Sequence, residues 1–234
     1  MLSSSQIVVG REVVLDTETT GLDPRQGHRI IEIGCIELVN HVPTGRHFHK
    51  YLNPEREIEV SAVAVHGLTA ERLASEPRFA EIADELLNFI EGAQLVIHNA
   101  EFDVGFINAE LAVLGLPPVP IERATCTVKM ARRRFPGAPA NLDALCRRFS
   151  IDNSGRNFHG ALLDAQLLAD CYLELLGGRQ QGLALAVETA AGGSMTIAGA
   201  IIQRAPRPHG PSEAELAAHA AMLAELKAPL WQEN

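Results

Sequence analysis

The chain has 234 residues, of which 47% are hydrophobic and 21% are charged, and its formal net charge is −9. This composition excludes wholesale disorder and supplies enough apolar side chains for a packed core. The length is ample for one domain and short for two, because domains usually hold about 100–200 residues. The net negative charge argues against a protein that binds DNA over a surface coated with basic residues.

No apolar run in the sequence approaches the roughly 18–20 residues that span a bilayer. Residues 1–10 also lack the basic region and the long apolar stretch of a secretory signal, so we expect a cytoplasmic protein. The cysteines form no CxxC pair, which argues against a zinc knuckle and favours reduced, buried thiols. They are Cys35, Cys126, Cys146 and Cys171.

Three strand candidates open the chain. They are a short apolar run at residues 13–15, a segment with two mostly apolar faces at 30–39, and a third segment at 47–52. Turn-rich gaps at 21–27 and 40–45 separate them. Strands that follow one another across short turns usually pair, so we expect an antiparallel meander.

Helical patterns then alternate with a fourth strand candidate. Residues 81–91 carry apolar side chains at helical spacing, and residues 95–98 are typical of a strand. Long helices are predicted over 102–114 and 162–176, the second ended by Gly177 and Gly178. Residues 1–178 are therefore expected to form one α/β domain.

The composition changes beyond residue 178. Residues 187–211 are rich in Ala, Gly and Pro without periodicity, so 179–211 is predicted to be a linker. Residues 212–234 are predicted to form a helical tail that begins with a capping-box pair, Ser212 and Glu215. Its apolar stripe suits a helix that docks on a partner or one that packs back on its own domain. The stripe consists of Leu216, Met222, Leu223 and Leu226, followed by Trp231.

Asp16 and Glu18 lie at the end of the first strand candidate. Side chains two residues apart on a strand point to the same face, where two carboxylates repel each other unless a cation lies between them. Hard divalent ions such as Mg²⁺ and Mn²⁺ take oxygen ligands of this kind. The pair therefore indicates a metal site, with a solvated strand end as the alternative.

Two more carboxylates stand at the beginnings of predicted helices. Asp103 follows the fourth strand candidate, at an edge where active-site residues of α/β sheets collect, although a helix N-terminus also favours an acid. His159 and Asp164 are five residues apart, which on a continuous helix would turn them about 140° away from each other. We therefore expect His159 on the loop before the helix and Asp164 within it, with Gly160 permitting the bend.

The order of these motifs resembles that of the DnaQ-like 3′→5′ exonucleases of the DEDD superfamily, in the branch whose fifth residue is His. The likeness runs from about residue 7 to residue 178 and is greatest to the proofreading subunits of bacterial replicative polymerases. It implies a ribonuclease H-like fold, in which helices flank a mixed sheet, followed here by a flexible C-terminal tail. The matching segments are DTETTG (16–21), IIEIG (30–34), VHG (65–67), VIHNA (96–100), NLDALC (141–146) and HGALLDA (159–165).

The resemblance also implies a reaction, the removal of mispaired nucleotides from DNA 3′ ends by two-metal hydrolysis that releases 5′-mononucleotides. Asp16 would bridge two divalent ions, Mg²⁺ or Mn²⁺. Glu18 and Asp164 would complete the first metal site, Asp103 would support the second ion, and His159 would act as general base. The residues expected to hold the terminal nucleotide are Asp16, Glu18, Thr19, His66, Asn99, Phe102 and Asp164.

One position departs from the family. A Glu that often helps to hold the 3′ end precedes the Val-His-Gly segment in these enzymes, and Ser61 stands in that stretch here. Outside the domain, Gln180, Leu183 and Leu185 resemble the short motif by which replication proteins dock on the sliding clamp. The tail after residue 211 resembles the segment that binds the alpha subunit of the polymerase.

Alternatives to this reading remain. The same catalytic residues would serve an RNA-processing exonuclease of the superfamily, and a non-catalytic bridge between polymerase and clamp would need only the linker and the tail. Residues 123–156 contain eight basic and two acidic residues. This segment is predicted either to guide the DNA backbone or to form a solvated helix face.

Overall fold

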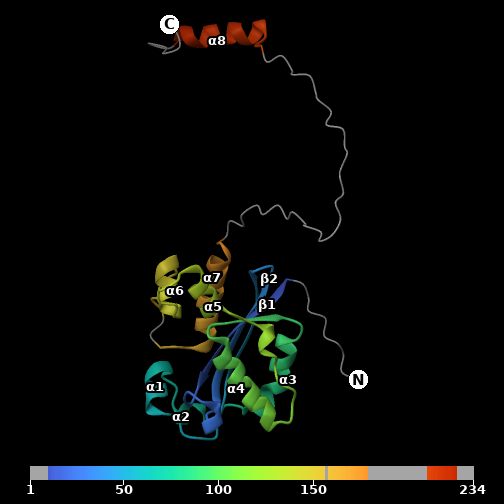
Figure 1. The fold of residues 1–234 in the computed structure, drawn as a ribbon, viewed down its shortest axis with the longest axis vertical. Helices are drawn as coiled ribbons and strands as arrows, with labels where there is room; N and C mark the ends of the chain where they lie inside the picture. Colours follow the sequence, from blue (N-terminus) through green and yellow to red (C-terminus); the bar gives the residue numbers. More distant parts are fainter. Residues whose placement is uncertain (1–9, 156–157, 179–209, 226–234) are drawn as a thin grey trace. The chain divides into compact units, whose positions relative to one another are not determined.

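The computed structural model describes residues 10–155, 158–178 and 210–225 (Figure 1). The chain divides into two compact units, Met1–Ala184 and Leu185–Asn234. Within the described residues, no helix is long and apolar enough to cross a membrane.

A five-stranded mixed sheet forms the centre of the first unit, with the spatial order β3-β2-β1-β4-β5. The first three strands pair antiparallel, which confirms the predicted meander, whereas β4 runs parallel to β1 and β5 runs parallel to β4. The strands are β1 (Arg11–Thr19), β2 (Ile30–Val39), β3 (Val42–Tyr51), β4 (Gln94–Ile97) and β5 (Ala124–Cys126).

The turn between β2 and β3 is tighter than expected. It consists of Asn40 and His41, both with positive φ angles of 51° and 65°. Two consecutive residues in this conformation form the kind of turn whose twist matches that of the flanking strands. β3 therefore begins at Val42, five residues before the predicted strand.

Seven α-helices are described in this unit, and the three predicted ones are confirmed as α3, α4 and α7. The sequence analysis missed α1, α2, α5 and α6, because none exceeds eight residues and so few turns carry little periodicity. The helices are α1 (Val60–His66), α2 (Ala70–Leu73), α3 (Phe79–Ile90), α4 (Ala100–Val113), α5 (Thr127–Arg134), α6 (Leu142–Phe149) and α7 (Ala161–Leu176).

The sheet separates two apolar cores. Val13 and Leu15 point to the face covered by α3 and α4, and Val14 points to the opposite face, covered by α5, α6 and α7. This alternation is the two-residue period of a strand that is buried on both sides. The predicted architecture, a mixed sheet flanked by helices, is confirmed.

Gly34 sets how closely α7 approaches the sheet. A Cβ atom at this position of β2 would overlap the backbone of Ala161 and Leu162 at the start of α7. Backbone cannot move aside as a flexible side chain can, so only glycine allows this packing. The close approach brings the first turn of α7, which contains Asp164, against the sheet.

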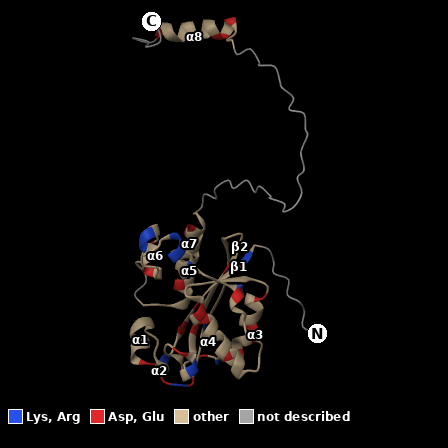
Figure 2. Cartoon of the chain, in the orientation of Figure 1, with Lys and Arg blue, Asp and Glu red and all other residues tan. Residues whose placement is uncertain are grey.

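The structure shows the burial of the cysteines and the contacts of two arginines from the basic segment 123–156. Cys35, Cys146 and Cys171 are buried as predicted, whereas Cys126 is only half-buried. Lys and Arg gather on α5 and α6 (Figure 2). Two arginines of the segment bind main-chain carbonyls: Arg123 donates to Ile90 and Ala93, and Arg134 donates to Glu174 and Leu175. Arg156 lies outside the described residues.

The second unit contains α8 (Glu213–Glu225). The predicted capping box is confirmed, because the Glu215 carboxylate accepts from the Ser212 backbone N–H at 2.8 Å and the Ser212 hydroxyl accepts from the Glu215 N–H at 3.3 Å. Leu216 and Met222 of the apolar stripe are exposed. The remaining predictions for this region lie outside the described residues, namely Gln180, Leu183, Leu185, Leu226 and Trp231.

Candidate active site

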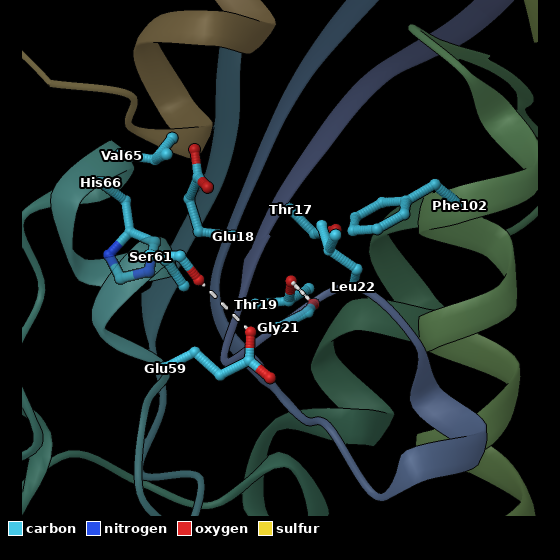
Figure 3. Close-up of a pocket in the computed structure, with 11 residues that line it drawn as sticks. Thr17, Glu18, Thr19, Gly21, Leu22, Glu59, Ser61, Val65, His66 and Phe102 are labelled. Carbon is cyan, nitrogen blue, oxygen red and sulfur yellow. Dashed lines mark hydrogen bonds between the residues drawn. The ribbon is translucent and has the colours of Figure 1, made fainter.

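Two adjoining cavities lie at the end of β1. The first, here called the carboxylate cavity, has a volume of about 240 Å³, and the second, the nucleoside cavity, has about 330 Å³. They share three lining residues, Thr17, Glu18 and Phe102 (Figure 3). A molecule that occupied both would therefore pass between the end of β1 and the first turn of α4.

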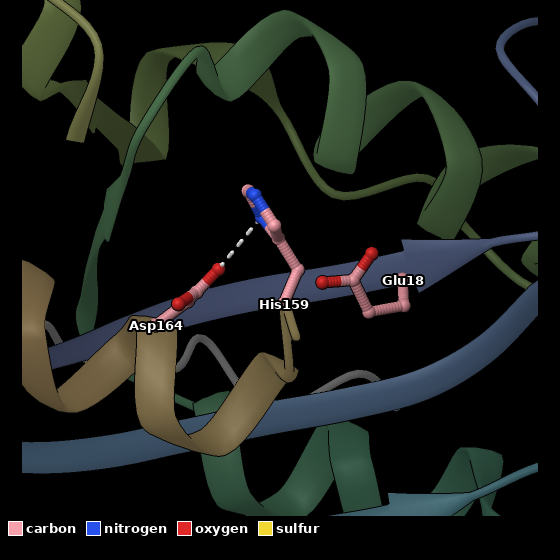
Figure 4. A group of neighbouring side chains, drawn as sticks. All are labelled: Glu18, His159 and Asp164. Carbon is pink, nitrogen blue, oxygen red and sulfur yellow. Dashed lines mark ion pairs between the residues drawn. The ribbon is translucent and has the colours of Figure 1, made fainter. Parts of the chain in front are cut away.

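The carboxylate cavity brings together all five residues that the motifs singled out. β1 supplies Asp16 and Glu18, and the first turns of α4 and α7 supply Asp103 and Asp164. His159 comes from the loop before α7. Single ligand atoms of Glu18, His159 and Asp164 lie within 4.8 Å of one another (Figure 4). Segments from four parts of the chain thus converge on one acidic cavity.

His159 lies on the loop before the helix, as predicted. Its backbone N–H donates to the Val65 carbonyl at 3.1 Å, and its Nδ1 lies 3.2 Å from an Asp164 carboxylate oxygen. The reason given for the bend is wrong, however. Gly160 has a φ of −154°, an extended conformation open to other residues, so the bend does not require glycine.

Asp103 is a buried acid of the carboxylate cavity with a strongly raised pKa. Burial raises its pKa from 3.8 to about 7, because a charge is poorly solvated inside the protein. Two hydrogen bonds from Thr17 act in the opposite direction. They come from the backbone N–H at 3.0 Å and from the hydroxyl at 2.7 Å, and both end on Oδ1. A cation beside this carboxylate would favour its charged form.

Apolar side chains line much of the nucleoside cavity, among them Leu22, Val65 and Phe102. Three of the residues predicted to hold the terminal nucleotide also line it, namely Thr19, His66 and Phe102. The Thr19 hydroxyl donates to the Gly21 carbonyl at 2.6 Å, which leaves its proton engaged. Asn99, by contrast, is exposed at the start of α4 with a φ of 69° and lines neither of the two cavities.

His66 offers a hydrogen-bond donor to the nucleoside cavity. Its Nδ1 accepts from the Leu68 backbone N–H at 3.0 Å, so the ring proton resides on Nε2. Nε2 is buried and has no hydrogen-bond partner among the described residues. Burial lowers the pKa of His66, which keeps the ring neutral. A buried donor without a partner is costly, so this nitrogen suits a ligand that accepts from it.

Several lining residues carried no assigned role in the sequence analysis. His98 and Asp143 line the carboxylate cavity, with His98 Nδ1 2.9 Å from the Thr127 hydroxyl. Glu59 lines the nucleoside cavity, and the Ser61 hydroxyl lies 3.4 Å from its carboxylate. Glu59 precedes the short helix α1 and belongs to none of the motifs, so the sequence held no signal for it.

Comparison with known proteins gives a consistent result. A family model described as exonuclease matches residues 13–172. The DNA polymerase III subunit epsilon of Rickettsia felis is 57% identical over 173 residues, which are 73% of this chain and 76% of that protein. The subunit epsilon of Escherichia coli is 49% identical over 188 residues, 77% of this chain and 76% of the relative.

A longer match reaches beyond the α/β domain. The DNA polymerase III subunit epsilon of Salmonella typhimurium is 45% identical over 230 residues, which cover 92% of this chain and 93% of that protein. Among solved structures, exonuclease X in complex with 5′-overhanging duplex DNA is 26% identical, with a TM-score of 0.56 over 70% of this chain and 90% of that chain. The nuclease domain of 3′hExo, a DEDDh family member, shares the fold at 18% identity, with a TM-score of 0.60 over 73% of this chain and 94% of the other.

Proposed function

This chain belongs to the exonuclease family, in the group of the DNA polymerase III epsilon subunits, and from this premise we propose how its own residues carry out the reaction. It is a 3′→5′ DNA exonuclease, a phosphodiester hydrolase that removes mispaired nucleotides during replication as part of a polymerase III complex. The observation that carries the proposal is the convergence of Asp16, Glu18, Asp103, His159 and Asp164 on one cavity.

Enzymes of this family use divalent metal ions, and the donor set of the carboxylate cavity fits such ions. We assign two ions, Mg²⁺ or Mn²⁺, to Asp16, Glu18, Asp103 and Asp164. Carboxylate oxygens are the ligands that these hard cations prefer. Four acids around one small cavity repel each other without a cation. Burial separately disfavours the charged form of Asp103 by raising its pKa, and a nearby cation would oppose this effect as well.

Each side chain then has a distinct task. When bound, divalent ions polarise a phosphoryl oxygen and make an attacking water more acidic. Asp16 and Glu18 would hold the scissile phosphate of the DNA at the end of β1 through such ions, because carboxylates by themselves repel a phosphate. Asp164 orients the imidazole of His159 through Nδ1. With Nδ1 turned to Asp164, Nε2 is the atom at which His159 takes the proton of the water.

The nucleoside cavity holds the terminal nucleotide. Phe102 packs on its sugar or base, a contact available to every base because each has an apolar face. His66 donates from Nε2, and Thr19 lines the cavity from the end of β1. Asn99 is exposed and lines neither cavity, so nothing in the structure supports a contact between it and the terminal nucleotide. Recognition that depends on stacking and shape suits an enzyme that removes any of the four bases.

The decisive experiment is release of 5′-mononucleotides from a 3′-mispaired DNA primer with and without Mg²⁺ or Mn²⁺. We expect hydrolysis that requires the metal and is abolished in the double variant D16A/E18A. Undiminished cleavage by this variant would overturn the metal assignment. A structured RNA end serves as the second substrate, and faster cleavage of RNA than of mispaired DNA would favour an RNA-processing enzyme.

The parts beyond residue 178 are assigned to partners. The tail at 212–234 binds the alpha subunit of DNA polymerase III, and Gln180, Leu183 and Leu185 dock on the sliding clamp, within the bacterial cytoplasm. Exposed apolar residues of α8 support a docking role, since a helix in a partner's groove buries such a face. The epsilon relative that matches 92% of the chain supports it too, because that match cannot be confined to residues 1–178.

A further inference from the structure

The last turns of α5 and α6 carry arginines that the mechanism proposed above does not use (Figure 2). Arg132, Arg133, Arg147 and Arg148, here called the arginine surface, are all exposed. We propose that the arginine surface binds the phosphates of the DNA strand on the 5′ side of the scissile bond. This inference rests on the proposed function and adds to it a path for the rest of the substrate strand.

The protein itself does not neutralise these charges. The chain contains 29 Asp and Glu residues against 20 Lys and Arg residues, so acids are available, and Arg46, for example, binds Glu37 at 2.8 Å. Arg132, Arg133 and Arg147 form neither an ion pair nor a hydrogen bond with any residue that the structure describes. Positive charges left together on the surface of an acidic protein attract an anionic partner.

Aromatic contacts bring the ends of the two helices together. The guanidinium of Arg148 lies 4.3 Å from the ring centroid of Phe135, the residue that follows α5, in a cation–π contact. Phe135 packs in turn on Phe149 of α6, with 5.9 Å between the ring centroids. The arginines of α5 and α6 therefore belong to one surface. Arg134 is not part of it, because its guanidinium donates to main-chain carbonyls of α7.

The arginine surface continues from the wall of the carboxylate cavity. Asp143 lines that cavity at the start of α6, and Arg147 comes four residues later, so both lie on the same face of the helix. On α5, Lys129 pairs at 2.8 Å with Glu101 in the first turn of α4, and the two arginines of α5 follow it on the same face. The arginines thus lie about one helical turn, roughly 5.4 Å, beyond the residues nearest the site.

The order of the two cavities decides which part of the DNA reaches this surface. Under the proposed function the nucleoside cavity takes the terminal nucleotide and the carboxylate cavity takes the scissile phosphate. The start of α6 lines the carboxylate cavity and does not line the nucleoside cavity. A strand that leaves in the direction away from the nucleoside cavity therefore passes α6, and this part of the strand lies 5′ of the cut.

The expected contacts are to phosphates and not to bases. Guanidinium groups match phosphate oxygens in charge and geometry, and such contacts carry no sequence information. At a rise of about 3.4 Å for each nucleotide, a surface one to two helical turns away meets phosphates about two to three nucleotides before the cut. A substrate shorter than this cannot reach the arginine surface.

A second explanation of the arginines makes different predictions. Basic residues in the last turn of a helix interact favourably with the helix dipole, which would give them a role in stability alone. In that case their removal lowers Tm and affects short and long substrates alike. Phosphate contacts instead predict an effect that depends on the length of the strand and on the salt concentration.

The test compares a DNA dinucleotide with a single strand of about 12 nucleotides, long enough to cover the arginine surface. The second-order rate constant for release of the first nucleotide is measured with Mg²⁺ and excess protein at increasing salt. The triple variant R132Q/R133Q/R147Q removes three charges and leaves the contact between Arg148 and Phe135 intact.

For the longer strand we expect the triple variant to lower this constant about tenfold, the usual sum of three surface ion pairs. Its dependence on salt, plotted as logarithms, should become shallower by about two, because each phosphate contact on a single strand contributes roughly 0.7. The constant for the dinucleotide should not change.

Two further variants serve as controls. R132K/R133K/R147K keeps the charges and should retain the salt dependence and most of the rate on the longer strand. R46Q/R72Q/R78Q removes the same number of charges from exposed arginines that line neither cavity, and it should preserve the rates on both substrates.

The outcomes separate this inference from the function on which it rests. If the unaltered protein releases no nucleotide from either substrate, the proposed function fails. If the triple glutamine variant degrades the longer strand normally, or if the lysine variant is equally impaired, the arginine surface is not a DNA site while the exonuclease function stands. Normal DNA degradation with lost binding to the polymerase alpha subunit would assign the surface to a protein and overturn the inference too. Should the glutamine variant fail to fold, equal salt dependences for the two substrates in the unaltered protein overturn it as well.

Discussion

Thr17 donates two hydrogen bonds to a single oxygen of Asp103, one from its backbone N–H and one from its hydroxyl. The two residues are 86 positions apart, and the contact joins the end of β1 to the first turn of α4. Thr17 lies between Asp16 and Glu18 on the strand, so one segment supplies two acids and the group that orients a third. The arrangement keeps a buried carboxylate in place although burial opposes its charge.

The raised pKa of Asp103 predicts how the metal-free protein responds to pH. Because its folded-state pKa of about 7 lies above the ordinary 3.8, the folded protein holds this proton more tightly than the unfolded chain does. The associated stability is complete below about pH 4 and is lost as the pH rises to about 7. Tm measured in EDTA should therefore fall between about pH 4 and pH 7, and added Mg²⁺ should oppose the fall.

The variant D103N isolates this effect. Asparagine keeps an oxygen for both Thr17 donors and removes the charge. The Tm of D103N at pH 8 in EDTA should therefore exceed that of the unaltered protein by several degrees, since each kcal/mol of stability shifts Tm by about 2–4 °C. Its exonuclease activity should drop about 10–100-fold or more, as for a disrupted metal site. D84N changes an exposed acid on α3 and should alter neither property. An equal pH response in D103N would contradict the assignment.

Gly34 provides a test of how α7 is positioned. G34A should overlap the backbone of Ala161 and Leu162, push the first turn of α7 outward and cost about 1–3 kcal/mol of stability. Because that turn carries Asp164, activity should fall as well. The matched control is G105A in α4, where an added Cβ meets no atom within 4 Å. This variant should gain about 0.5–1 kcal/mol of stability, because alanine is favoured over glycine inside a helix. Thermal melts measure the stability of the two variants, and primer degradation measures their activity. Normal activity in G34A would refute the role of Gly34 in positioning α7.

Tyr172 binds near the start of β1, the end of the strand away from the carboxylate cavity. Its hydroxyl donates at 2.6 Å to Glu12, whose other oxygen lies 2.6 Å from His41 Nδ1. Y172F should destabilise the protein by about 1.5–3 kcal/mol, because it removes a bond to a charged acceptor. The exonuclease rate should not change, since Glu12 begins the strand that Asp16 and Glu18 end. The control is Y51F, because the Tyr51 hydroxyl has no hydrogen bond to another described residue, and it should shift stability by less than about 0.5 kcal/mol.

Truncation tests the division of the chain. A protein ending at Gly178 should retain exonuclease activity and lose binding to the polymerase alpha subunit, because the proposed docking segment is absent. Copurification of the truncated protein with the polymerase would show that the tail is dispensable.

Clamp binding should depend on a different segment. The full chain with Gln180, Leu183 and Leu185 changed to alanine should lose binding to the sliding clamp while retaining binding to the alpha subunit. Surface-captured clamp and polymerase, tested in parallel against this variant, separate the two contacts. Equal loss of both partners would mean that the two segments do not act independently.

Local pattern was sufficient for much of the fold. The apolar residues on both faces of 30–39 and the helical spacing of 162–176 predicted β2 and α7 with nearly their observed bounds. Both elements are long and bury strongly patterned faces, so periodicity is a reliable signal there. β5 has three residues and α2 has four, so each spans little more than one period of its own pattern and carries little evidence for a strand or a helix.

For the candidate site, too, the sequence accounts for one part and the tertiary structure for the other. The sequence by itself determined which four acids and which histidine to look for, and all five line the carboxylate cavity, because each stands near the end of a strand or the start of a helix, where short motifs keep their spacing. Only the tertiary structure decided what surrounds them: Thr17 beneath Asp103, Gly34 beneath α7, and His28 behind Glu59. These contacts join residues that are 31 to 128 positions apart, so no local pattern encodes them. They depend on the packing of sheet against helix, which arises only when the whole domain has folded.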